Sequence, residues 1–192
     1  MANIGASIGH NLRNLARFSG RDTRAQFWPW AIAVFIGATI ATMAVIVPIL
    51  LETMIAFQQL IHQPVDPKTG VYPPPIEPDA FQNLMPDFAR LQIPFAAINA
   101  IAGLLLAAAV ARRLHDRDKS GFWGLIPVPF FIIGALLMPQ AVQFGTQVEP
   151  GPLPVIASLN SALTWVAFIG LIVVLVGEST PGPNRYGDPE TA

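Results

Sequence analysis

The charged run Arg112-Arg113-Leu114-His115-Asp116-Arg117-Asp118-Lys119-Ser120-Gly121 lies between two long apolar stretches. It carries four of the eleven Lys and Arg residues, whereas residues 91–111 before it and 122–140 after it contain no Asp, Glu, Lys or Arg. An apolar stretch of about 20 residues is long enough to cross a bilayer as a helix. The run is therefore predicted to be a loop between two transmembrane helices.

The composition extends this interpretation to the whole chain. Hydrophobic residues make up 53% of the 192 residues and charged residues only 12%, about half the charged share of a typical soluble domain. We predict an all-α membrane protein, a single membrane domain with four transmembrane helices plus a short N-terminal amphipathic helix. The predicted spans are 27–51, 91–111, 122–140 and 154–176, with a Pro-rich extracytoplasmic loop at 52–90 and a cytoplasmic tail at 177–192.

Four spans place both termini on the same side of the membrane, and the Lys and Arg residues indicate which side. Two of these residues, Lys68 and Arg90, lie on the side away from the termini. The nine on the side of the termini are Arg13, Arg17, Arg21, Arg24, Arg112, Arg113, Arg117, Lys119 and Arg185. Because positive charges are retained inside, both termini and the charged run are predicted to be cytoplasmic.

The segment before the first span has an amphipathic pattern. Arg13 and Arg17 flank an apolar face at helical spacing. The residues of that face are Ile4, Ile8, Leu12, Leu15 and Phe18. The pattern predicts a helix that lies on the inner leaflet; alternatively, it is a solvated helix packed on the protein.

The spans contain no ionisable side chain, which disfavours a proton pump or an ion-coupled transporter. Asn99 and Asn160 are predicted to hydrogen-bond between the second and fourth spans. Small residues at four-residue spacing predict close helix packing, or alternatively helix-mediated self-association. These residues are Ala33, Gly37 and Ala41 in the first span and Gly103, Ala107 and Ala111 in the second.

The remaining composition predicts neither a metal site nor a cofactor. The chain has no cysteine, and its three histidines lie in separate segments. The net charge of −1 gives no reason to expect a nucleic-acid partner. His115 and Asp116 could in principle form an acid–base pair, in which the carboxylate orients the imidazole. Residues adjacent in sequence seldom place their side chains in this way. A structural role is therefore favoured, and no catalytic residue is assigned.

Three segments together resemble one protein family. They are Phe18 to Trp28 with its Gly20-Arg21-x-x-Arg24 pattern, the Arg112 to Asp116 stretch, and Asn184-Arg185-Tyr186-Gly187. This combination is similar to the DUF805 family of bacterial inner-membrane proteins, whose function is unknown. The resemblance implies a location in the inner membrane and implies no activity. The chain departs from the pattern of that family at two positions: Gln26 stands where Glu is usual, and Asp118 stands where Gly is usual.

All three motifs fall on one face of the predicted bundle, and we predict that they meet there. One interpretation is a cationic cluster that binds a lipid headgroup or a phosphorylated ligand, formed by Arg21, Arg24, Arg112, Arg113 and Arg185. The residues with a predicted structural role are His115, Asp116, Asn184 and Tyr186. The alternative is a salt-bridge network that fixes the geometry of the loops.

The predicted function is that of a non-enzymatic scaffold or lipid-interacting protein. Its expected partners are membrane lipids, including anionic ones, and a second copy of the chain. The alternative is an interfacial membrane enzyme that acts on a phosphorylated or lipid substrate.

Overall fold

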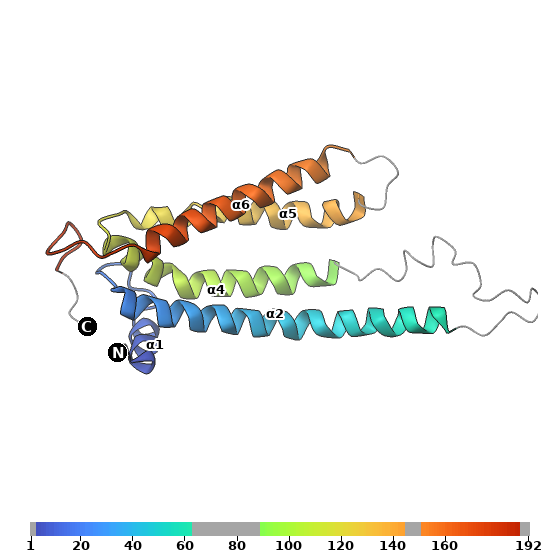
Figure 1. The fold of residues 1–192 in the computed structure, drawn as a ribbon, viewed down its shortest axis with the longest axis horizontal. Coiled ribbons are helices and arrows are strands. Elements are labelled where there is room, and N and C mark those ends of the chain that lie inside the picture. The colour runs from blue at the N-terminus through green and yellow to red at the C-terminus, as the bar shows by residue number, and fades with distance from the viewer. Residues whose placement is uncertain (1–2, 63–88, 145–150, 189–192) are drawn as a thin grey trace, which may run out of the picture.

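The computed structural model describes residues 3–62, 89–144 and 151–188 (Figure 1). These residues form α-helices and one 3₁₀ helix, and the part of the chain that is described contains no β-sheet. In chain order the helices are α1 (Ile4–Arg13), α2 (Arg24–Ile61), α4 (Ala89–His115), the 3₁₀ helix η1 (Gly121–Leu125), α5 (Val128–Phe144) and α6 (Leu153–Val176). The prediction of an all-helical architecture is confirmed over these ranges.

Three helices, α2, α4 and α6, are long and apolar enough to cross a membrane. In a helix every interior backbone group bonds within its own segment, which is what a lipid environment requires. The α5 helix has 17 residues, about 26 Å at 1.5 Å per residue, which is shorter than a hydrocarbon core of roughly 30 Å. Three of the four predicted spans are therefore present at full length.

The third predicted span, 122–140, differs from the structure for a local reason. Its first residues form η1, which Ser120 caps by accepting a hydrogen bond from the backbone N–H of Phe122. Pro127 and Pro129 lack the N–H that a helix interior needs and are tolerated only before or within a first turn. The α-helix accordingly begins only at Val128, and the predicted start at residue 122 falls in the 3₁₀ helix η1.

The α2 helix begins with a capping box. The Thr23 hydroxyl accepts a bond from the backbone N–H of Gln26, and the Gln26 side chain accepts one from the backbone N–H of Thr23 at 2.8 Å. The helix continues to Ile61 because residues 52–61 contain neither Gly nor Pro. The predicted loop at 52–90 therefore started too early, and 63–88 lie outside the described residues.

The α4 helix includes the first part of the charged run, so the prediction of a loop from Arg112 onward was wrong. The backbone N–H of Lys119 donates to the Leu114 carbonyl at 2.9 Å, and that of Asp118 donates to the His115 carbonyl at 2.9 Å. Asp118 has a φ of 54°. These are the bonds and the left-handed residue of a Schellman motif, which ends the helix sharply.

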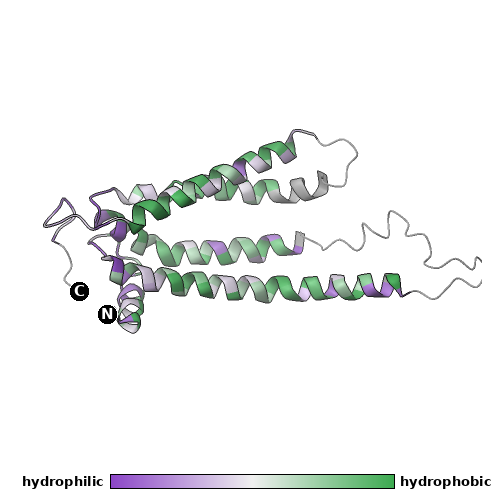
Figure 2. Cartoon of the chain, viewed as in Figure 1, coloured by the Kyte–Doolittle hydropathy of each residue, from purple (hydrophilic) through white to green (hydrophobic). Residues whose placement is uncertain are grey.

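The helices pack as two pairs, α2 beside α4 and α5 beside α6 (Figure 1). The C-terminal ends of α4 and α6 meet the N-terminal end of α2, and the apolar core lies there. The cluster consists of Phe27, Trp30, Val34, Ala109, Leu114 and Leu175. Figure 2 shows hydrophilic residues gathered at this same end, while the lengths of the helices are mostly apolar. The candidate site lies at this end.

The predicted N-terminal helix is present as α1, and its protein-facing side carries both polar and apolar residues. Ser7 and Asn11 are buried, and their side chains donate to the Gln26 carbonyl at 2.5 and 2.9 Å. Ile4 and Leu12 remain exposed. Ile8 of α1 and Leu15 after it are partly buried and pack against the apolar cluster. The interpretation of a helix packed on the protein is therefore correct for these residues, and a position on the inner leaflet stays a prediction.

The amide side chains in the spans have different partners from those predicted. Asn160 in α6 donates to the Phe130 carbonyl of α5 at 3.0 Å, and Asn99 donates to the Phe95 carbonyl within α4 at 2.8 Å. The prediction that these two residues hydrogen-bond between the second and fourth spans (α4 and α6) was wrong, because α6 packs along α5.

The glycines of the two small-residue faces make no close helix contact. A Cβ atom placed on Gly37 or on Gly103 would meet nothing within 4 Å. Close packing within the bundle at these two positions was therefore a wrong prediction. Self-association through these faces stays a prediction.

Candidate functional site

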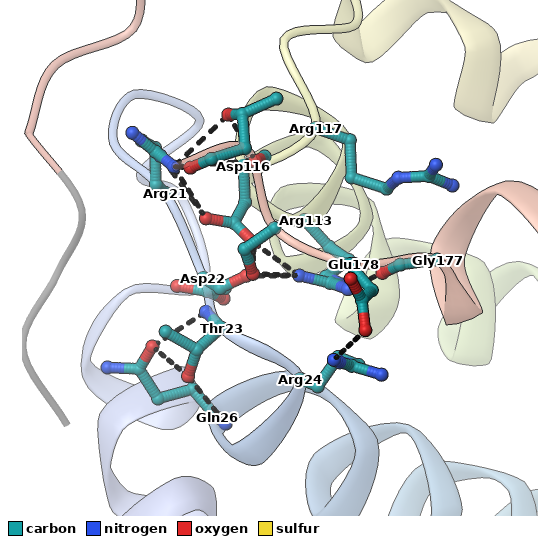
Figure 3. Close-up of polar contacts among 12 residues, drawn as sticks. Arg21, Asp22, Thr23, Arg24, Gln26, Arg113, Asp116, Arg117, Gly177 and Glu178 are labelled. Carbon is teal, nitrogen blue, oxygen red and sulfur yellow. Dashed lines mark hydrogen bonds and ion pairs between the residues drawn. The ribbon is translucent and has the colours of Figure 1, made fainter. Parts of the chain in front are cut away.

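Five charged side chains are buried together where the ends of α1, α2, α4 and α6 meet. Figure 3 labels Arg21, Asp22, Arg113 and Asp116 among them. Each residue is at most 3% exposed. Buried charges are costly unless they are paired and hydrogen-bonded. We call this set the arginine network; its members are Arg21, Asp22, Arg112, Arg113 and Asp116.

Arg112 connects α4 to the end of α1. Its guanidinium donates to the carbonyls of Asn14 and Arg17 at 2.8 and 2.6 Å. It also donates to the Asn11 side chain at 2.8 Å, and its Nε donates to Asp22 at 2.9 Å. The link between α1 and α2 is thereby held against the last turn of α4.

Arg113 connects α4 to α6. Its Nε donates to the Leu175 carbonyl at 2.9 Å, and its Nη2 donates to the Gly177 carbonyl at 2.5 Å. Arg117 adds a bond to the Val174 carbonyl. The last carbonyls of a helix have no partner within the helix and carry partial negative charge. Two guanidiniums from α4 and the turn after it therefore cap the C-terminus of α6.

Arg21 connects the start of α2 to the C-terminal tail, residues 177–188. Its guanidinium donates to the carbonyls of Gly182 and Thr180 at 2.8 and 2.9 Å, and to that of Gly187 at 3.2 Å. It also lies 3.1 Å from the Asp116 carboxylate. Figure 3 shows Arg21 directed toward Asp116. The three sequence motifs therefore meet in space.

Asp116 and Asp22 supply the negative charge of the network. The Asp116 carboxylate accepts bonds from Arg21, from Arg113 and from the Ser179 hydroxyl. The Asp22 Oδ1 accepts the bond from Arg112 and lies 3.0 Å from His10 Nε2. Three buried guanidiniums thus face two buried carboxylates. The backbone carbonyls of α6 and the tail supply the remaining acceptors.

One atom of the network has no partner among the described residues. The Asp22 Oδ2 is buried and accepts no hydrogen bond. The other carboxylate oxygen of Asp22 is engaged twice, by Arg112 and by His10. In the part of the chain that the structure describes, the Asp22 carboxylate is therefore hydrogen-bonded through Oδ1 but not through Oδ2.

The tail forms a turn that folds over the end of α4. Asn184 and Gly187 exchange backbone hydrogen bonds at 3.1 and 3.0 Å, and Gly187 has a φ of 114°, which favours glycine. The Asn184 side chain donates to the His115 carbonyl at 2.9 Å. The Tyr186 ring stacks on the His115 ring with centroids 3.8 Å apart and an interplanar angle of 8°.

His115 and Asp116 do not form the acid–base pair that the sequence alternative requires. The His115 Nδ1 lies 3.3 Å from the Gly20 carbonyl, and the Asp116 carboxylate is engaged by Arg21 and Arg113. The two side chains have separate partners, so the geometric basis for general acid–base chemistry at this pair is missing.

Two of the five arginines predicted to bind a ligand lie outside the network. Arg24 is exposed and lies 3.8 Å from the Glu178 carboxylate. Arg185 is also exposed; it lies 3.0 Å from Asp118 and stacks over Tyr186 at 4.9 Å. Binding of a headgroup by the predicted set stays a prediction, but three of its members are enclosed by the protein.

Several members of the site carried no signal in the sequence. Asn11, Ser179 and Thr180 are residue types common on any polar surface, and their bonds to Arg112 and Asp116 join residues 63 to 101 positions apart. Most of the acceptors are backbone carbonyls, which every residue has. Within the described ranges, no group of three His, Asp or Glu side chains could hold a metal ion.

Comparisons with known proteins give one match. Residues 15–188 match the model of a family described as "Protein of unknown function (DUF805)". Neither the curated proteins nor the solved structures contain a match. The matched range includes every member of the arginine network.

Proposed function

The chain belongs to the DUF805 family, and from that premise we propose that it is a non-enzymatic scaffold of the bacterial inner membrane. In this proposal α2, α4, α5 and α6 cross the membrane four times, and both termini lie in the cytoplasm. Nine Lys or Arg residues on the side of the termini against two on the other support this orientation. The antiparallel course of α5 along α6 (Figure 1) supports the fourth crossing.

The observation that carries the scaffold role is the use of the buried arginines. Arg112, Arg113 and Arg21 each bind a different segment of the same chain: the end of α1, the end of α6 and the tail. Charge-assisted hydrogen bonds to several carbonyls fix direction as well as distance. The network therefore serves as a rigid connection between the cytoplasmic ends of the two helix pairs.

Such a connection makes the cytoplasmic surface a fixed platform. The tail turn, the Schellman turn at Asp118 and the α1 helix keep constant positions relative to one another, because each is bound to the last turns of α4. A partner that contacts two of these segments at once loses little conformational entropy on binding. This is the property that a scaffold requires.

The orientation is tested by cysteine labelling, since the natural chain has no cysteine. Single substitutions Gln59→Cys, Gly151→Cys and Glu178→Cys are treated with a membrane-impermeant maleimide in intact cells. We expect labelling at residues 59 and 151 from outside, and labelling at 178 only after permeabilisation. Labelling at 178 in intact cells would reverse the orientation, and protection at 151 would remove the fourth crossing.

The choice between scaffold and enzyme is tested with His115→Gln in a strain that depends on the protein. If the protein is a scaffold, the variant will fail to support growth of this strain only when its protein level falls or when its tail becomes accessible to protease. A variant that has a normal protein level and a protected tail but does not support growth would contradict the scaffold proposal and favour the enzyme.

A further inference from the structure

The helix α1 packs only part of its apolar face on the protein: Ile8 contacts the apolar cluster, and the rest of that face is exposed. Ile4 is 64% exposed and Leu12 is 51% exposed, whereas the buried positions of the helix are Ser7 and Asn11. A helix on a soluble protein normally turns its apolar stripe toward the core. The apolar side of α1 therefore needs an environment other than water.

The position of α1 indicates which environment this is. The helix packs against the first turn of α2 through the Gln26 carbonyl, and Figure 1 shows it turned across the axis of α2 at the end of the bundle. That end is where the apolar helices begin and end. A helix in this place lies in the plane of the membrane interface.

The charge of this segment favours an anionic surface. Residues 1–20 contain no Asp or Glu, and Arg13 and Arg17 are both exposed. Among the described residues, neither of these two arginines has an acidic partner. This distinguishes them from the exposed arginines near the network, since Arg24 and Arg185 are each paired with a carboxylate.

We propose that α1 and the residues up to Phe18 form a binding surface for anionic phospholipid. Ile4, Leu12 and Phe18, which is 53% exposed, enter the boundary between headgroups and acyl chains. Arg13 and Arg17 bind lipid phosphates. The inference rests on the proposed placement of the bundle in a membrane and not on the scaffold role. It assigns lipid recognition to two arginines outside the three sequence motifs.

The depth of α1 is measured with spin labels on the full chain in phospholipid nanodiscs. Leu12→Cys places a nitroxide on the apolar side. Ala6→Cys, the matched control, places one at another exposed position, about 120° around the helix from Leu12 and on the side of Arg13. We expect the label at 12 to be more accessible to oxygen and the label at 6 more accessible to a water-soluble nickel complex. Equal access of nickel to both labels, or no access of either reagent to the label at 12, would overturn the proposal.

The charge preference is measured by native mass spectrometry of the full chain, titrated with phosphatidylglycerol and with phosphatidylcholine. Each Arg near an anionic surface contributes roughly fivefold in affinity, so Arg13→Gln with Arg17→Gln is expected to weaken phosphatidylglycerol binding about thirtyfold and leave phosphatidylcholine binding unchanged. The control removes the same charge through Arg24→Gln with Arg185→Gln and is expected to keep the preference.

The two measurements separate the possible failures. A normal phosphatidylglycerol preference in the Arg13 and Arg17 variant, or its loss in the control variant alone, overturns the assignment of these arginines even if α1 lies in the interface. Failure of the cysteine-labelling topology would instead contradict the membrane orientation, which a spin label at Leu12 does not report.

Discussion

Replacement of Asp116 by Asn tests whether the arginine network holds the end of the bundle together. The change keeps the shape of the side chain but removes a carboxylate that lies 3.1 Å from Arg21 and also pairs with Arg113. Three buried guanidiniums would then face one buried carboxylate, that of Asp22. Removal of one partner from a buried ion pair costs about 3–5 kcal/mol. Because Asp116 serves two cations, we expect the free energy of unfolding to fall by at least about 3 kcal/mol.

Two assays on the purified chain in detergent measure this effect. Unfolding by SDS is followed by the fluorescence of the tryptophans, of which Trp30 is buried beside the network. Limited trypsin digestion reports the release of the tail by cleavage after Arg185. The Asp116 carboxylate accepts a hydrogen bond from Ser179 of the tail and one from Arg21, and Arg21 donates to the tail carbonyls of Thr180 and Gly182. We expect the variant to unfold at lower SDS and to be cleaved faster.

The matched control is Glu178→Gln. It removes the same charge from the same end of the molecule, but the Glu178 side chain is 90% exposed and its contact with Arg24 is 3.8 Å long. Exposed pairs of this kind contribute little, so the control is expected to match the natural chain. If Asp116→Asn also unfolds and is cleaved like the natural chain, the reasoning about the network is refuted.

Three further predictions concern the turns around the network. Asp118→Gly is expected to raise the melting temperature, because Asp118 has a φ of 54°, which glycine adopts more readily. Asp118→Val is expected to lower the free energy of unfolding by about 1–2 kcal/mol. Opposite results would contradict the idea that the left-handed backbone at Asp118 is strained. Gly124→Ala is expected to cost about 1–3 kcal/mol, because its Cβ would lie 2.8 Å from Val110, while Gly103→Ala, with nothing within 4 Å, costs nothing; equal SDS midpoints would contradict this. Tyr186→Ala is expected to lose about 0.5–1.5 kcal/mol of ring stacking and to speed hydrogen exchange in the tail, whereas Tyr186→Phe is not.

Local composition is enough to predict where a long apolar helix lies. It is not enough to predict the residue at which that helix ends when the end lies in a polar segment. The fourth span was predicted at 154–176, and the apolar helix α6 covers Leu153–Val176. The second was predicted to end at residue 111 but continues through His115. Charged residues there suggested a loop, whereas in the structure Arg112 donates to the segment after α1 and Arg113 donates to α6 and the tail. Those partners are distant in the sequence and invisible to any local window.

The candidate site shows the same division. The sequence indicated which motifs carry the charge and that they lie on one face. It could not indicate that Arg21, Arg112 and Arg113 are buried while Arg24 and Arg185 are exposed. All five are identical in residue type, and burial depends on which backbone carbonyls converge on each guanidinium. Only the folded arrangement of α1, α6 and the tail determines that.

The capping of α6 by Arg113 has a consequence for the order of synthesis. Most of the carbonyls that Arg113 and Arg21 bind belong to residues 175–187, which a ribosome makes after both arginines. Until then neither guanidinium has these acceptors. In the orientation proposed above, both would remain positive charges that favour retention of their segment inside the cell, and they would become buried only after α6 and the tail have been made. In that orientation each arginine would act first as a topogenic signal and later as a link between segments. A nascent chain arrested before residue 175 would have the Asp116 carboxylate but not the carbonyls of α6 and the tail that enclose both guanidiniums.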